Sequence, residues 1–65
     1  MKSKAERPYR IFYTTPKGQE RVFYIKGENP LSALTDFKLR TGHSEECVTL
    51  VEVEVKALGV WQKAM

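Results

Sequence analysis

A chain of 65 residues has room for one small domain and not for two. Hydrophobic residues make up 42% of it and charged residues 29%, which excludes disorder over most of its length. No apolar run approaches the roughly 20 residues of a membrane-spanning helix, and the only cysteine, Cys47, has no partner for an intrachain disulfide. We therefore expect a protein of the cytoplasm, a reducing compartment, with no membrane contact.

The net charge of +3 is unevenly distributed. Residues 1–32 contain seven Lys and Arg against three Glu, or +4, whereas residues 33–65 contain four basic and five acidic residues, or −1. A basic N-terminal half favours an anionic partner such as nucleic acid. Basic side chains that merely keep a small domain soluble would give the same totals, so charge alone leaves both interpretations open.

Three segments are expected along the chain. Residues 1–7 show no hydrophobic periodicity and predict a flexible basic arm. Residues 8–58 form a single domain, and residues 59–65 form a C-terminal tail. The tail either folds back onto the domain through Trp61 or stays loose.

Residues 9–26, YRIFYTTPKGQERVFYIK, predict a β-hairpin. The turn TPKG at residues 15–18 has proline and glycine where a three-residue loop with a bulge requires them. If the residues flanking the loop pair, Ile11 lies opposite Phe23 on one face of the hairpin. The other face then carries Arg10, Phe12, Thr14, Glu20, Val22 and Tyr24. Both faces therefore carry aromatic side chains, although a sheet covered on one side needs only one apolar face.

A helix is predicted over residues 30–41, PLSALTDFKLRT. Asn29 is a good N-cap, Pro30 fits the first helical position, and Gly42 fits a left-handed C-cap. The apolar stripe that would face a sheet consists of Ala33, Leu34 and Phe37.

Residues 47–57, CVTLVEVEVKA, predict a third strand in which valines alternate with Glu52 and Glu54. The alternation breaks upstream, because Val48 and Leu50 fall on the glutamate side. Either a bulge shifts the strand there, or its first half is buried on both faces.

The order strand, strand, helix, strand predicts an α+β fold. We expect a three-stranded antiparallel sheet (β-β-α-β, order 2-1-3) with one helix packed on one face. The second face of the hairpin then needs a cover from another molecule or from the segment around Trp61.

The chain offers no catalytic constellation. His43 is the only histidine, and Cys47 follows it by four residues, which could suggest a thiolate dyad or half a zinc site. Structural zinc takes about four ligands, and no further Cys or His exists. We therefore predict a protein that is not an enzyme and has no metal, no cofactor and no small-molecule substrate.

Two binding functions remain. In the first, the uncovered sheet face binds a protein partner or a second copy of the chain, giving a homodimer. The residues expected to make this contact are Arg10, Phe12, Arg21, Val22 and Tyr24.

In the second, the domain binds RNA or DNA. Phe12 and Tyr24 would stack on bases, as aromatic side chains on sheets do in RNA-binding domains. The residues expected to contact phosphates are Lys2, Lys4, Arg7, Arg10, Lys17, Arg21 and Lys26.

Over residues 9–57 the chain resembles small phage-encoded inhibitors of host enzymes. Its length and element order are similar to those of the phage inhibitor of bacterial RNA polymerase. The segments YIKG, LS and DFKLRTG, followed by an acidic last strand, resemble the order of features in the inhibitor of uracil-DNA glycosylase. That inhibitor is acidic and mimics DNA, whereas this chain is basic; the mimicry would have to be carried by Glu45, Glu46, Glu52 and Glu54. Small anti-CRISPR proteins have a similar size. The resemblance implies binding to, and inhibition or modulation of, a host protein of nucleic-acid metabolism.

A second resemblance points to the ribosome. The segment RTGHSEECVTLVEVEV is similar to the corresponding part of the archaeal ribosomal protein LX family, a basic domain with a hairpin and a helix. It implies a ribosome-associated nucleic-acid-binding module.

Overall fold

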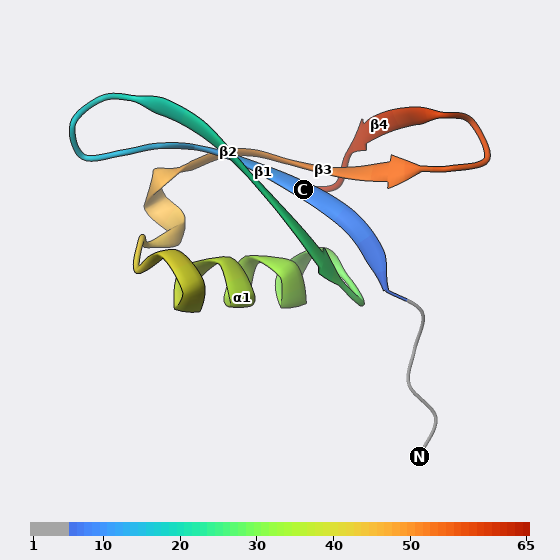
Figure 1. Cartoon of the computed structure of the whole chain (residues 1–65), viewed down its shortest axis with the longest axis horizontal. Coiled ribbons are helices and arrows are strands. Elements are labelled where there is room, and N and C mark those ends of the chain that lie inside the picture. The colour runs from blue at the N-terminus through green and yellow to red at the C-terminus, as the bar shows by residue number, and fades with distance from the viewer. Residues whose placement is uncertain (1–5) are drawn as a thin grey trace, which may run out of the picture.

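A computed structural model describes residues 6–65 of the chain. Its fold is α+β, with one antiparallel sheet in the order β2-β1-β3-β4 and one α-helix. Figure 1 shows the helix on one side of the sheet. The elements are β1 (Arg7–Thr14), β2 (Glu20–Gly27), α1 (Pro30–Thr41), the 3-10 helix η1 (Glu45–Cys47), β3 (Val48–Val55) and β4 (Val60–Lys63).

The predicted hairpin is confirmed in its register. Ile11 of β1 lies opposite Phe23 of β2. The Thr15 N–H donates to the Gln19 carbonyl at 2.8 Å, and the Gly18 N–H donates to the Thr15 carbonyl at 2.8 Å. Gly18 has a φ of 85°, the left-handed conformation that ends this type of loop. The turn therefore sets which residues share a face of the sheet.

The boundaries of α1 are also confirmed. The Asn29 side chain accepts a hydrogen bond from the Ser32 backbone N–H at 2.8 Å. Gly42 adopts a φ of 77°, and its N–H donates to the Lys38 carbonyl at 2.9 Å. Both helix ends are thus capped by the residues whose chemistry suits them.

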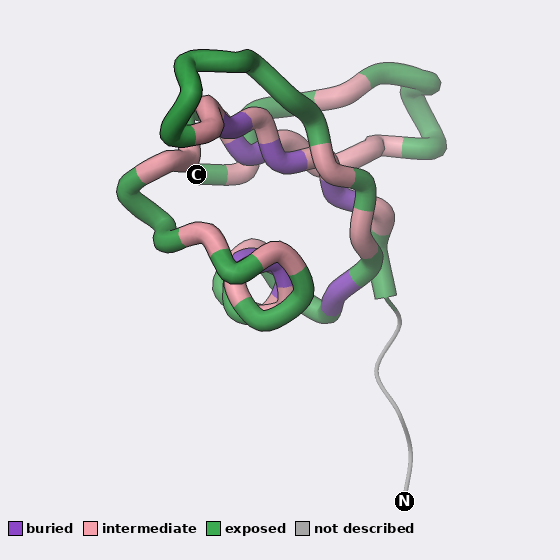
Figure 2. Tube along the Cα trace, turned by 60° about the vertical axis from the view of Figure 1, so that its left-hand side comes forward, coloured by how far each residue is buried: buried purple, intermediate pink, exposed green. Residues whose placement is uncertain are grey.

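The core lies between α1 and the face of the sheet that the helix covers. Ile11 and Phe37 are fully buried. The Phe37 ring meets the rings of Tyr13 and Phe23 edge-on, with centroids 5.0 and 5.6 Å apart. Figure 2 shows the buried residues on β1 and on the sheet side of α1. The core consists of Tyr9, Ile11, Tyr13, Ala33, Leu34, Phe37 and Val51.

A bulge resolves the broken alternation in β3. Phe12 pairs with Leu50 and Tyr13 pairs with Val48, so Thr49 is the extra residue between them. The Thr49 hydroxyl donates to the Phe12 carbonyl at 3.2 Å. Because of the bulge, Val48 packs against the core while Leu50 lies on the opposite face.

The prediction of three strands was wrong, because a fourth strand, β4, completes the sheet. It lies in the segment predicted as a tail and pairs with β3, with Trp61 opposite Glu54. The Ala64 N–H extends the pairing by donating to the Val51 carbonyl at 2.7 Å. Four residues are too few to show an alternating pattern, so the sequence gives no clear signal for this strand. β4 forms because the edge of β3 is available to pair with it. At the other end of the chain, β1 begins at Arg7, inside the predicted arm; residues 1–5 of the arm, with Lys2 and Lys4, lie outside the described residues.

Within residues 6–65, no helix is both long enough and apolar enough to cross a bilayer.

Replacing Asn29 tests the helix start. Asn29→Ala removes the acceptor for the Ser32 N–H, and we expect the free energy of unfolding to fall by about 1 kcal/mol in urea denaturation followed by circular dichroism. Asn29→Asp keeps an oxygen acceptor at the positive end of the helix and should retain the wild-type value. Equal losses in both variants would contradict the capping role.

Candidate functional site

The candidate site is the sheet face opposite α1, which we call the open face (Figure 1). Residues of β1 alternate between the two faces, so the buried Tyr9, Ile11 and Tyr13 place Arg10 and Phe12 on the open face. The strand registers extend this face over all four strands. Its side chains are Pro8, Arg10, Phe12, Thr14, Glu20, Val22, Tyr24, Lys26, Leu50, Glu52, Glu54, Trp61 and Lys63.

Arg10 is the centre of this face. Its Nε donates to a carboxylate oxygen of Glu52 at 2.6 Å. Its guanidinium carbon lies 4.4 Å from the centre of the Trp61 ring and 5.4 Å from that of Phe12. Tyr24 meets Trp61 edge-on, with ring centroids 6.2 Å apart. We call these five residues the Arg10 cluster; it combines an ion pair with cation–π contacts.

The strand register brings the cluster together. Arg10 lies directly opposite Tyr24 of β2 on one side and Glu52 of β3 on the other. Trp61 reaches Arg10 because β4 pairs with β3 and places the indole on the same face. The cover that the hairpin lacked in sequence is therefore supplied in part by Trp61, from the segment predicted as a tail.

The charge of Arg10 is compensated within the domain. The hydrogen bond with Glu52 is the largest of the effects that raise the pKa of the Arg10 guanidinium above its ordinary value. The side chains of Arg10 and Glu52 are 27% and 18% exposed, so both are partly shielded from water. A phosphate group could bind Arg10 only in competition with the Glu52 carboxylate.

On the open face, the apolar surface that stays uncovered lies on β2. Tyr24 is 63% exposed and Val22 is 40% exposed, whereas Phe12, Leu50 and Trp61 are half-buried. The open face therefore has a covered part over β1, β3 and β4 and an exposed apolar part over β2. We call the exposed pair Val22 and Tyr24 the β2 patch.

The structure brings together four of the five residues predicted to bind a partner: Arg10, Phe12, Val22 and Tyr24. Arg21 lies on the other face, because it pairs with the core residue Tyr13, and its guanidinium donates to the Gln19 side chain at 3.0 Å.

The basic residues predicted to bind phosphates are spread out. Arg7 and Lys26 lie at one end of the hairpin and Lys17 lies in the turn at the other end. Strands of eight residues separate the two ends by about 26 Å. Arg10, between these ends, is paired with Glu52.

His43 and Cys47 both contact residues of the core. The His43 ring stacks against that of Phe37, and its centroid lies 5.2 Å from the centroid of the Tyr13 ring. Cys47 packs against the core. No three His, Cys, Asp or Glu side chains in the described chain are grouped so that they could hold a metal ion.

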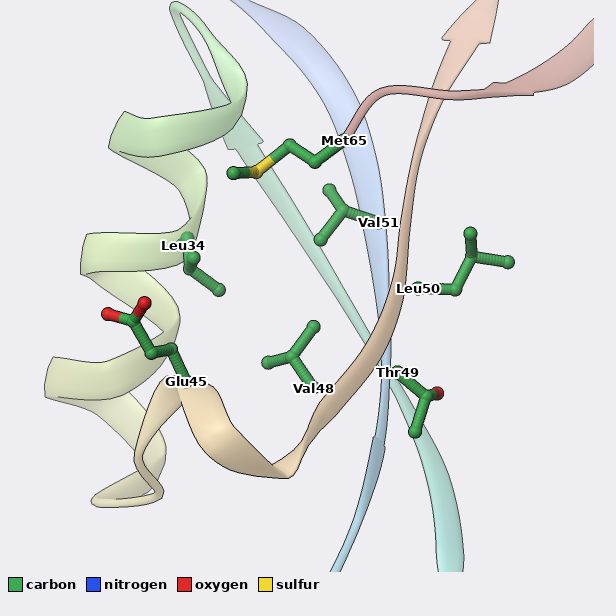
Figure 3. Close-up of a pocket in the computed structure, with 7 residues that line it drawn as sticks. All are labelled: Leu34, Glu45, Val48, Thr49, Leu50, Val51 and Met65. Carbon is green, nitrogen blue, oxygen red and sulfur yellow. The ribbon is translucent and has the colours of Figure 1, made fainter.

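A groove of about 240 Å³ lies between α1 and β3. Figure 3 shows Leu34, Val51 and Met65 lining it, with Glu45 at its side. Glu45 is the only charged lining residue, and its carboxylate accepts a hydrogen bond from the Lys38 ammonium at 3.0 Å. The side chains that line the groove therefore include no pair of titratable groups for acid–base chemistry.

The residues predicted to bind a protein partner or phosphates do not include two members of the cluster, Glu52 and Trp61; Glu52 was named only among the glutamates that mimicry of DNA would require. The alternation in β3 places Glu52 on the open face, but its pairing with Arg10, 42 positions away in the sequence, depends on the register between β1 and β3. Trp61 was recognised as a possible cover, although no strand was expected around it.

Comparison of the chain with protein-family models, with curated protein sequences and with solved structures gives no match. The function is therefore inferred from the residues of this chain.

Removing Arg10 tests the cluster. Trp61 is the only tryptophan, so its fluorescence reports on the packing of β4. In Arg10→Ala the indole loses its cation contact, and we expect red-shifted emission and stronger quenching by iodide. Arg21→Ala is the matched control, since Arg21 lies on the other face and should leave the emission unchanged. Unchanged emission in Arg10→Ala, or the same shift in both variants, would contradict the described packing.

Proposed function

We propose that the chain is a non-catalytic binding domain that contacts a protein partner through the β2 patch. The observation that carries this proposal is the exposure of Tyr24 and Val22 beside side chains that are already packed. Exposed aromatic residues next to a well-packed surface are typical of the energetic centres of protein interfaces. The Arg10 cluster would hold the Tyr24 ring in place and so lower the entropy cost of binding.

A protein partner is supported better than a nucleic acid by the distribution of charge. The central guanidinium of the open face is paired with Glu52. Of the other residues predicted to contact phosphates, Arg7 and Lys26 lie at one end of the hairpin and Lys17 lies at the other, while Arg21 lies on the opposite face. Nucleic-acid affinity depends mainly on basic side chains that follow the phosphates together. The exposed part of this face, over the edge strand β2, instead offers an aromatic ring and a branched aliphatic side chain.

The partner class in this proposal comes from the sequence resemblance to phage-encoded inhibitors. The contact would inhibit or modulate a host protein of nucleic-acid metabolism. Because the chain carries +3 rather than a net negative charge, the contact would depend on apolar surface instead of mimicry of DNA.

The test is capture of a partner by the immobilised chain, followed by an affinity measurement with the identified protein. Truncating an aromatic residue at the centre of an interface costs about 2 kcal/mol or more, so Tyr24→Ser should weaken binding at least about thirtyfold. Leu39→Ser is the matched control, because Leu39 is a 78% exposed leucine on α1, away from the open face. Equal affinity of wild type and Tyr24→Ser would contradict the proposal.

The nucleic-acid alternative is measured in parallel with generic RNA and DNA at two salt concentrations. If the basic residues bind phosphates, the logarithm of the affinity should fall by about 0.9 per duplex contact, or about 0.7 per single-strand contact, for each tenfold rise in salt. Binding with such a slope would replace the protein-binding proposal with the second one.

A further inference from the structure

The outer edge of β2 is unpaired among the described residues, because β2 is the last strand on its side of the sheet. β4, at the other edge, has only four residues, whereas β2 has eight. Long edge strands invite pairing with another strand unless a proline, a bulge or a central charge prevents it. Residues 22–25 contain none of these, and β2 pairs with β1 without a register shift.

The backbone groups on this edge are directed outward at known positions. The turn places residues 15 and 19 in a hydrogen-bonded pair. Hydrogen-bonded and non-hydrogen-bonded pairs alternate along an antiparallel ladder, so the N–H and C=O groups of Glu20, Val22, Tyr24 and Lys26 point away from β1. A further strand could accept and donate hydrogen bonds at these four residues.

The charges on β2 are arranged so that the strand complements itself. Glu20 begins the strand and Lys26 lies near its end, both exposed, and residues 22–25 between them are uncharged. The third charged residue of the strand, Arg21, lies on the other face of the sheet. In an antiparallel pair of two β2 strands centred on Phe23, Glu20 of each copy lies opposite Lys26 of the other. The same register places Val22 opposite Tyr24 of the second copy, so that the two exposed apolar side chains contact each other side by side. All these pairs join positions whose backbone groups point outward.

We propose that two copies of the chain associate through their β2 edges, antiparallel and centred on Phe23, to form a continuous eight-stranded sheet. Two helices would then lie on one face, on either side of the two-fold axis. On the other face the two β2 patches would join into one apolar strip, with an Arg10 cluster on each side. The contact goes beyond the proposed function, since it uses the strand edge and needs no other partner.

Sedimentation velocity of the purified full chain over a wide concentration range tests the association. We expect a concentration-dependent equilibrium between monomer and dimer. Glu20→Lys places Lys opposite Lys at both ends of the interface, and Lys26→Glu places Glu opposite Glu. Opposite-charge cross-strand pairs stabilise and like-charge pairs destabilise, so each single variant should dimerise about tenfold more weakly than wild type.

Mixing the two single variants tests the register itself. One variant carries Lys at both positions and the other carries Glu at both, so a heterodimer has complementary charges at each end. An equimolar mixture should therefore associate about tenfold more tightly than either variant alone. The double variant with both changes should also recover wild-type dimerisation, because its charges are exchanged but still complementary.

Lys17→Glu is the matched control, because it changes the net charge as Lys26→Glu does but lies in the turn, outside the pairing. It should dimerise as wild type does. A wild-type chain that stays monomeric at every concentration overturns the proposal, as does equal weakening by Lys17→Glu and Lys26→Glu. A mixture that associates no better than its components overturns the register. These measurements involve purified chain only, so their failure is distinct from a failure to bind a protein partner through Tyr24.

Discussion

The central position of β1 is the constraint on which the rest of the structure depends. β1 pairs with β2 on one side and β3 on the other. The side chains from the middle of β1 therefore lie away from the sheet edges, on both faces of the sheet. The single helix can cover only one of these faces, where Ile11 packs with Phe37. The other face, with Arg10 and Phe12, has to be covered by side chains of the sheet itself. That requirement accounts for β4 and for the arrangement around Arg10.

Arg10 fills this position because a guanidinium can satisfy two kinds of neighbour at once. Its planar face lies against Trp61 and near Phe12, while its Nε donates to Glu52. An aliphatic side chain in the same place would add to the exposed apolar surface, and an unpaired charge would gain less from its neighbours. The cluster shields the part of the open face over β1, β3 and β4 without a second layer of structure. β2 stays uncovered on the open face and along its outer edge. Both proposed contacts therefore involve β2.

Local chemistry made much of the fold predictable. The turn residues, the helix caps and the alternation of side chains act within a few residues of one another, so the hairpin register, the bounds of α1 and the position of β3 followed from them. The bulge at Thr49 could be predicted only as one of two alternatives, since either would break the pattern of β3 in the same way. β4 was missed because it has four residues and depends on an edge supplied by a strand earlier in the chain.

For the candidate site, the sequence by itself determined which side chains the hairpin presents: Arg10, Phe12, Val22 and Tyr24 share a face because the turn sets the register and strand geometry does the rest. Only the tertiary structure decided which residues those side chains contact. Pairing of β1 with β3 neutralised Arg10 with Glu52, and pairing of β3 with β4 brought Trp61 over the guanidinium. These contacts join residues 42 and 51 positions apart, and no local preference encodes them. They form because β1 is an inner strand with large side chains on both faces. The helix covers one face, so side chains of β3 and β4 have to cover the other.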